Sequence, residues 1–385
     1  MRTKTYDIII AGSGSVGTPT ALFLTKSGLK VLVIDPLPSS GQGSNKRAIG
    51  GVRATHSDSA KIYLCANSID ILSSWENKYG DDIDWQPGGY AFVAYDESIK
   101  NILQELLIIQ KSFGLEIDWR DASEIVDLVP GINQEGLLGG TFSPHDGFAS
   151  PLKANYSYFT NALRHGAEFH FHEKVIGFNL YEGKINQVVT DKDVYSCKYF
   201  INAAGSWAAE VSDLLGVSIP VKPDSHEAGI TEPVAPLLKP MLVDIRERPG
   251  SSNFYFYQQK SGKIIFCVTP NPLIWGNYNQ GTPQFLPMAG KRLIEILPQL
   301  ANIRVRRTWR GTYPMTPDGS PLVGTVDGIE GYILATGMCG QGFMLGPGVA
   351  NLLTHLIHGT LSDKEIECLN HLRYNRAFTV AERLK

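Results

Sequence analysis

A glycine-rich turn between two apolar runs at the start of the chain most constrains the fold. Residues 7–11 (DIIIA) form an apolar run that is typical of a buried parallel strand. The turn GSGSVG follows at 12–17 in the pattern GxGxxG, and a segment of helical character leads to a second apolar run at 31–34, which ends at Asp35. This order of strand, turn, helix, strand and acid predicts a Rossmann-like α/β domain that binds a dinucleotide.

Each glycine of the turn has a separate physical task in such a domain. Gly12 permits the tight turn, Gly14 lets the backbone approach a pyrophosphate, and Gly17 lets the helix pack closely on the strand. The free N–H groups at the helix N-terminus face the phosphates. Asp35 lies 18 residues beyond the last glycine, and its carboxylate is suited to accept hydrogen bonds from a ribose. The motif alone leaves open NAD, FAD and an unrelated α/β protein with a glycine-rich turn.

Two later segments also place glycine at the end of an apolar strand. They are residues 199–207 (YFINAAGSW) and residues 331–344 (GYILATGMCGQGFM), and the second precedes an expected helix at 349–357. An NAD dehydrogenase needs no third glycine-rich element about 300 residues downstream, whereas an extended FAD does, because its isoalloxazine must also be held. These segments favour FAD, with two unrelated loop clusters as the alternative.

Composition limits the partners and the compartment. Because 35 Lys and Arg stand against 38 Asp and Glu, no basic excess favours nucleic acid. No stretch resembles a signal peptide or a membrane span. The five cysteines lie far apart without a CxxC pair, which favours reduced thiols and argues against a metal site. These features predict a cytoplasmic protein without a metal, and peripheral attachment to a membrane stays open.

Six motifs in order carry a resemblance to a known family: DIIIAGSGSVG…VID, GGVRATHSD, INAAGSW, HEAGITEP, WRGTYPMTPDGSPLVG and GMCGQGFMLGPG. On these motifs the chain resembles the FAD-dependent D-amino-acid-oxidase-like superfamily. Within it, the chain is most similar to the sarcosine oxidase β subunit and the β subunit of dye-linked L-proline dehydrogenase. The resemblance covers nearly the whole chain and implies an FAD-dependent oxidoreductase.

The resemblance also implies which residues bind FAD. They are Gly12, Gly14, Gly17, Asp35, Ser44, Asn45, Lys46, Gly51, Val175, Ala204, Gly205, Trp207, Gly311, Gly340, Gln341, Gly342, Phe343 and Met344. Many relatives have His at the position of Gln341. Gly311 stands where monomeric sarcosine oxidases attach flavin through a Cys, so we expect non-covalent FAD.

The implied reaction is oxidation of the CH–NH group of a secondary or cyclic amino acid, such as proline or sarcosine. A hydride passes to flavin N5, and the imine is then hydrolysed or released. Ile265 stands where relatives have the Lys that activates oxygen, so a dehydrogenase is favoured over an oxidase. Met344 stands where relatives have a Lys in the substrate-carboxylate pocket. Lys263, two residues from the first position, reaches it only through a shift in the alignment.

Four residues are candidates for the substrate site. Arg53 resembles the family Arg that holds the substrate acid, and a guanidinium suits bidentate contact with a carboxylate. Tyr313 resembles a substrate-contacting tyrosine, at a position where glycine oxidases have Arg. His56 and His226 could lie near the flavin or the substrate. The alternatives are a surface arginine, a half-buried strand tyrosine and histidines satisfied within their loops.

Two other functions stay open at this point. The same fold and cofactor could oxidise a 2-hydroxy acid or glycerol 3-phosphate, which would need anion-binding Lys and Arg and a histidine base. The chain could also be a non-catalytic flavin subunit of a larger complex. The expected partners are a small amino-acid-like substrate and an electron acceptor: a dye, a quinone, a partner subunit or oxygen. Either a hetero-oligomer with other subunits or a homo-oligomer is compatible with the sequence.

The expected organisation is a discontinuous FAD-binding domain with a second, α+β domain on the substrate side. The first would comprise residues 1–80, 145–215 and 310–385, and the second residues 81–144 and 216–309. Alternating aromatic and β-branched residues in the second domain predict a mainly antiparallel sheet. The charged tail from residue 361 onward is expected to form a peripheral helix.

Overall fold

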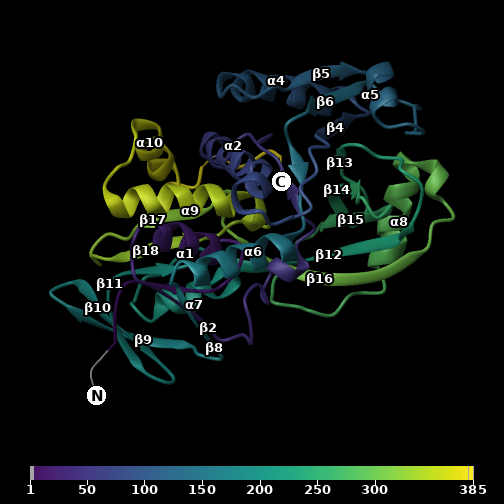
Figure 1. Cartoon of the computed structure of the whole chain (residues 1–385). Coiled ribbons are helices and arrows are strands. Elements are labelled where there is room, and N and C mark those ends of the chain that lie inside the picture. The colour runs from purple at the N-terminus through teal and green to yellow at the C-terminus, as the bar shows by residue number, and fades with distance from the viewer. Residues whose placement is uncertain (1–3, 380, 385) are drawn as a thin grey trace.

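The computed structural model describes residues 4–379 and 381–384, which form two large sheets lying side by side (Figure 1). The first sheet has the order β17 (Leu322–Thr325), β18 (Tyr332–Thr336), β11 (Val194–Asn202), β1 (Lys4–Ala11), β2 (Val31–Asp35) and β8 (Glu168–Phe171). From β18 to β8 the neighbouring strands are parallel, and β17 pairs antiparallel at the edge. The hairpin of β9 (Val175–Tyr181) and β10 (Lys184–Thr190) extends the sheet beside β11.

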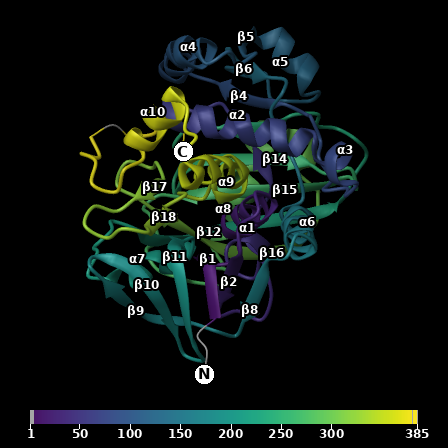
Figure 2. The same ribbon diagram turned by 60° about the vertical axis from the view of Figure 1, so that its left-hand side comes forward.

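Helices cover one face of the first sheet, as Figure 2 shows for α1, α6 and α9. These are α1 (Gly17–Lys26), α6 (Pro151–Arg164), α9 (Gly342–His358) and α2 (Ser59–Ser73), whose apolar side chains pack on alternate residues of β1 and β2. The opposite face is covered by the β9–β10 hairpin and α7 (Ala208–Asp213). Burial on both faces explains why the strands read as continuous apolar runs.

The second sheet is mainly antiparallel, and only β13 and β4 pair in parallel. Its order is β16 (Val305–Met315), β12 (Lys222–Pro233), β15 (Lys263–Pro270), β14 (Ser251–Gln258), β13 (Met241–Asp244), β4 (Tyr90–Ala94), β6 (Gly139–Ser143) and β5 (Asp118–Asp121). Helices α8 (Phe285–Ile296) and α5 (Ala122–Leu128) pack on one face, and α4 (Glu97–Ser112) packs on the other.

Short elements complete the described chain. They are β3 (Gly51–Val52) paired with β7 (Gly147–Phe148), α3 (Trp75–Tyr79), α10 (Asp363–His371), and the 3-10 turns η1 (Asn45–Arg47), η2 (Gly205–Trp207) and η3 (Pro298–Leu300). Within the described ranges, no helix is long and apolar enough to cross a membrane.

These elements confirm the expected fold, a Rossmann-like α/β unit joined to an α+β unit with a mainly antiparallel sheet. The domain boundaries stay a prediction, and β16 crosses the expected one at residue 310, since its pairing with β12 runs on to Met315. The helix expected at 349–357 begins earlier, at Gly342.

The expected peripheral tail is wrong beyond α10. The chain turns back into the interior, where Glu382 and Leu384 are buried. The cause is electrostatic and specific, because the Glu382 carboxylate lies 3.0 Å from the Lys61 ammonium at the start of α2.

Candidate functional site

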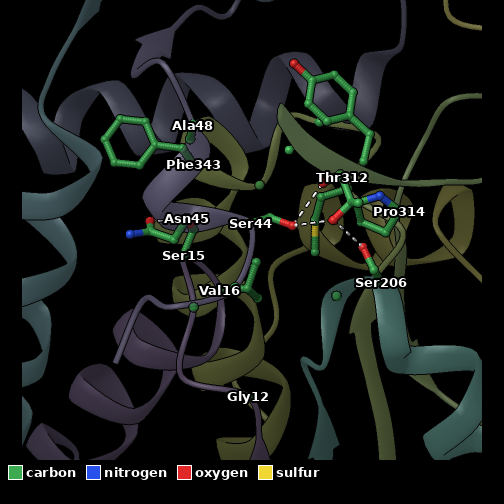
Figure 3. A pocket seen from close by; sticks show the side chains of 18 of the residues that line it. Gly12, Ser15, Val16, Ser44, Asn45, Ala48, Ser206, Thr312, Pro314 and Phe343 are labelled. Atoms are coloured by element: carbon green, nitrogen blue, oxygen red, sulfur yellow. Dashed lines mark hydrogen bonds between the residues drawn. The ribbon is translucent and has the colours of Figure 1, made fainter. Parts of the chain in front are cut away.

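A cavity of about 750 Å³ lies between the two sheets and is lined from both. That volume is within the usual range of small-molecule and cofactor pockets. Figure 3 shows how three distant segments meet at its wall: Ser44 Oγ donates to the Thr312 carbonyl (2.9 Å), and Ser206 Oγ donates to Thr312 Oγ1 (3.1 Å). The cavity therefore joins the glycine-rich edge of the first sheet to one face of the second.

The glycine turn has the geometry expected of a phosphate-binding turn. Gly12 has a φ of +101°, and a Cβ there would lie 2.5 Å from the Ala203 carbonyl oxygen. A Cβ on Gly17 would overlap the Gly12 carbonyl, so this glycine lets α1 pack against the turn. A Cβ on Gly14 meets nothing within 4 Å and Gly14 lines the cavity, so its backbone faces open space.

Asp35 lines the same end of the cavity, but its carboxylate also organises the turn. Oδ2 accepts from the backbone N–H (2.8 Å) and the hydroxyl (2.7 Å) of Ser13, and Oδ1 accepts from the N–H of Leu37 (2.9 Å). These bonds fix the turn relative to the end of β2. A carboxylate offers about four acceptor sites, so one position stays available for a ribose hydroxyl.

The cavity brings together the residues that the resemblance assigns to FAD, except Gly17 and Lys46. The Lys46 ammonium lies on the surface and donates to Gln42 Oε1 (2.9 Å). The neighbouring Arg47 lines the cavity instead, and its backbone carbonyl accepts from the indole N–H of Trp309 (2.8 Å). Whether the other assigned residues contact FAD stays a prediction.

The start of α9 forms the second glycine-rich wall. Gln341 is buried, lines the cavity, and its Oε1 has no hydrogen-bond partner. A buried polar atom without a partner is costly, so this oxygen fits a donor group on a ligand. Gly340 has a φ of +82°, and a Cβ there would overlap the Tyr313 ring. With the open space at Gly14 and the N-termini of α1 and α9, these features fit FAD.

His226 and Tyr313 line the cavity together from neighbouring strands. Their rings stack with centroids 3.8 Å apart and planes 20° apart. His226 Nε2 lies 2.7 Å from Asp224 Oδ2, while its Nδ1 is buried and has no partner. The structure thus places two of the four substrate-site candidates in direct contact.

Two further side chains complete this wall. The Tyr255 and Tyr313 hydroxyls lie 2.8 Å apart, and the Cys267 thiol lies 3.9 Å from the Tyr313 hydroxyl. Burial raises the pKa of both phenols well above its ordinary value and raises the pKa of the thiol to about 11. All three groups are therefore neutral at neutral pH.

Arg53 also lines the cavity, but its guanidinium already has several partners. Nη1 donates to the Thr55 carbonyl and lies 3.1 Å from His56 Nδ1, and Nη2 donates to the Leu384 carbonyl. The group also lies over the Phe92 ring, 5.3 Å from the centroid. These three contacts use three of the five guanidinium N–H groups, so two remain for a substrate carboxylate.

His56 is not brought to the cavity. It is fully buried, with Nδ1 facing Arg53 and Nε2 lying 3.4 Å from the Cys65 sulfur. Burial, followed by the positive charges of Arg53 and Lys61, lowers the pKa of His56 well below its ordinary value. His56 is therefore a neutral interior histidine between charged neighbours. This agrees with the alternative of a satisfied histidine rather than with a place near the flavin.

Sequence reasoning missed Asp224, Tyr255 and Cys267. Asp224 and His226 are two residues apart on a strand and so share one face, which the period of two could have indicated. Nothing local marks Tyr255 and Cys267, because the alternating segments 253–257 and 264–268 also supply the apolar core. Among the described residues, no group of three or more His, Cys, Asp or Glu side chains could hold a metal ion.

Comparisons with known proteins agree with this architecture. The hydrogen cyanide synthase subunit HcnC of Pseudomonas protegens is 26% identical over 403 residues, covering 94% of this chain and 92% of that protein. The sarcosine oxidase subunit beta of Rhodobacter capsulatus is 23% identical, covering 92% and 85%. The crystal structure of L-proline dehydrogenase from P. horikoshii superposes with a TM-score of 0.90 at 27% identity, covering 97% and 99%.

The family model DAO, described as FAD dependent oxidoreductase, matches residues 7–356, which is most of the chain. The expected resemblance and the expected cofactor, FAD, are thereby confirmed. The chain belongs to the DAO family of FAD-dependent oxidoreductases.

Proposed function

We propose that this chain oxidises the CH–NH group of a secondary or cyclic amino acid that resembles proline or sarcosine. One observation carries the proposal: the cavity that holds the FAD-type glycine turns continues to a wall of His226, Tyr255 and Tyr313 on the second sheet, and Asp224 is buried beside His226. The similarity to proteins named L-proline dehydrogenase and sarcosine oxidase subunit beta supports an amine substrate at that wall.

The residues of the chain divide the work around FAD, which supplies the hydride acceptor when bound. Tyr313 and Tyr255, neutral because of burial, offer hydroxyl groups that can orient the substrate without adding charge. Arg53 lines the cavity and supplies a carboxylate contact through the N–H groups that Thr55, His56 and Leu384 leave unused. Arg47 lines the cavity as a second guanidinium, with one backbone acceptor, the Gly43 carbonyl at 3.2 Å.

We propose a dehydrogenase that passes electrons to a dye, a quinone or a partner subunit rather than an efficient oxidase. On β15, alternate residues Cys267 and Thr269 line the cavity, whereas Lys263 is exposed at the start of the strand. Among the described lining residues, Lys174 is the one lysine, and it neighbours Val175, where the resemblance places the adenine. A partner subunit fits the names of two relatives, which are subunits.

A second candidate is oxidation of a 2-hydroxy acid, and the environment of His226 favours it specifically. Oxidation of a hydroxyl needs a base, and His226, which lines the cavity and whose Nδ1 is buried without a partner, can serve as one. The same wall can therefore bind either substrate class, and the substrates themselves must separate them.

The test is anaerobic bleaching of the visible flavin band of the purified holoenzyme by matched substrates. The panel pairs proline and sarcosine with lactate and glycerol 3-phosphate. Bleaching by a secondary amine and not by hydroxy compounds is expected. Bleaching only by hydroxy compounds would overturn the amine proposal in favour of the second candidate, and no bleaching by any of them would favour a non-catalytic flavin subunit. In air, slow peroxide formation is expected, whereas rapid formation contradicts the dehydrogenase.

A further inference from the structure

Asp224 and His226 form a buried pair on the cavity face of β12. The imidazole Nε2 lies 2.7 Å from Asp224 Oδ2, and the two side chains are 0% and 4% exposed. The second carboxylate oxygen, Oδ1, accepts from the backbone N–H of Ile274 (2.7 Å) and of Ser225 (3.0 Å). The carboxylate is thus fixed on both sides, and it fixes the ring in turn.

The hydrogen bond determines which ring nitrogen carries the proton. Burial alone would raise the pKa of Asp224, but the bond to His226 and the two backbone N–H groups outweigh burial and lower it. An ionised carboxylate only accepts hydrogen bonds, so Nε2 must carry hydrogen. In the neutral ring, the lone pair is then on Nδ1, which is buried and has no partner.

The ring cannot easily turn away from the cavity. Tyr313 stacks on it at 3.8 Å, and Gly340 leaves just enough room for that tyrosine. The other titratable groups at this wall, Tyr313, Tyr255 and Cys267, are kept neutral by burial. The Glu227 carboxylate is engaged by the N–H (2.7 Å) and the hydroxyl (2.6 Å) of Thr282. Asp224 is therefore the charged group that acts directly on His226.

We propose that Asp224 is a positioning residue that holds His226 with Nδ1 facing the substrate, so that Nδ1 takes the proton from a protonated amine. The substrate N–H bond breaks, the Nδ1–H bond forms, and the electron pair stays on the substrate nitrogen. The amine is then neutral, as hydride loss from its neighbouring carbon requires. The Asp224 carboxylate stabilises the resulting imidazolium. This inference rests on the proposed amine oxidation and adds that the amino acid binds with its nitrogen protonated.

The first test replaces Asp224 by Asn in the holoenzyme. The amide oxygen can still accept from Ile274, but its NH2 group then faces the ring, which must adopt the other tautomer with Nδ1 protonated. The rate of anaerobic flavin reduction by the amine should fall at least about a hundredfold. The dependence of that rate on pH in the wild-type enzyme should be lost in this variant.

Ser225→Ala is the matched control. The Ser225 hydroxyl donates to the Gly276 carbonyl (2.6 Å) and accepts from the N–H of Tyr278 (3.1 Å), so it fastens the same loop as Asp224 without touching His226. This variant should keep both the rate and its pH dependence. An equal loss in Ser225→Ala and Asp224→Asn would mean that Asp224 only fastens the loop, and would overturn the inference.

A second measurement needs no substrate. In holoenzyme labelled with [15N]histidine, with His226 assigned through His226→Gln, the side-chain nitrogens should show Nε2 protonated in the wild type and Nδ1 protonated in Asp224→Asn. The same tautomer in both proteins sinks the inference, whatever the substrate. If the tautomers differ as expected but no amine bleaches the flavin, the proposed function fails while the role of Asp224 as the residue that sets the tautomer stands.

Discussion

The glycines of the turn after β1 meet two different requirements. Some keep the turn stable, and one leaves an open path for a phosphate. Gly12 and Gly17 are required by the protein itself, because a Cβ at either position would collide with backbone atoms. Gly14 has no such neighbour and faces the cavity. The same motif therefore contains positions needed for folding and a position needed only for the ligand.

Gly14→Ala should leave the folded apoprotein intact and weaken FAD binding. The added methyl group enters open space in the protein, so the free energy of unfolding of the apoprotein should change by less than about 1 kcal/mol. The same methyl group occupies the approach of the pyrophosphate, so the Kd for FAD should rise at least about tenfold. Urea unfolding of the apoprotein and fluorescence titration with FAD measure the two effects.

Gly17→Ala is the contrasting variant, because its Cβ would overlap the Gly12 carbonyl. It should destabilise the apoprotein by about 1–3 kcal/mol or more. If Gly14→Ala destabilised the apoprotein as much as Gly17→Ala, or bound FAD with unchanged affinity, the assignment of Gly14 to the pyrophosphate would be wrong.

Prediction of single residues succeeded where a local motif sets the geometry. It failed where contacts with distant parts of the chain set the geometry. The glycine turn after β1 could be located from strand ends and spacing alone, whereas the helix expected at 349–357 begins at Gly342. Lys46 and Arg47 could not be told apart, since which of them faces the cavity depends on the packing of η1 against β16. For His56 the sequence left open a place near the flavin and a satisfied loop histidine, since its partner Glu382 lies 326 residues further along the chain.

At the scale of elements, the described C-terminal residues pack over the start of α2 and bind to it through buried polar contacts. The Glu382 carboxylate accepts from the N–H (2.9 Å) and hydroxyl (2.7 Å) of Ser57 and lies 3.0 Å from the Lys61 ammonium. Burial alone would raise the pKa of Glu382, but the positive charges of Lys61 and its neighbours outweigh burial and lower it. The segment also supplies the Leu384 carbonyl to Arg53.

Glu382→Gln should destabilise the protein by about 3–5 kcal/mol, because it leaves the buried Lys61 ammonium without its counter-charge. Glu105→Gln is the matched control, since Glu105 pairs with Arg383 of the same segment at 3.1 Å but on the exposed surface. That variant should cost less than about 1 kcal/mol. Denaturant unfolding of both variants measures the two losses of stability, and equal losses would contradict a buried ion pair between Glu382 and Lys61.

The same carboxylate predicts how stability depends on pH. Because the pKa of Glu382 is lower in the folded protein than its ordinary value of about 4.3, the unfolded chain takes up this proton first as pH falls. The stabilisation is therefore fully present above about pH 5 and is lost progressively as pH falls through the unfolded-state pKa toward the lower folded-state pKa. The difference in unfolding free energy between wild type and Glu382→Gln should shrink as pH falls from 5 to 3, and a constant difference would contradict the pairing.

At the scale of the whole molecule, the sequence predicted two sheets but not how they share one cavity. Apolar runs and alternation identify strands because burial on one or two faces leaves a local pattern. The cavity instead depends on register: β12 pairs with β16 so that Asp224 lies opposite Tyr313 and His226 opposite Gly311. No local pattern reports that pairing, since the two strands lie about 80 residues apart in the chain.

Because the cavity is lined by both sheets, FAD should stabilise both. At a free concentration of a hundred times its Kd, FAD should add about 2.7 kcal/mol to the free energy of unfolding. Hydrogen exchange of apoprotein and holoenzyme should show slower exchange not only in the turn after β1 but also in β12 and β16, whose residues His226 and Thr312 line the cavity. Strands β10 and β5 contribute no residue to the cavity lining and serve as internal controls with unchanged exchange. Protection confined to the first sheet would mean that FAD does not reach the wall formed by Asp224 and His226, and the substrate site proposed there would have to be abandoned.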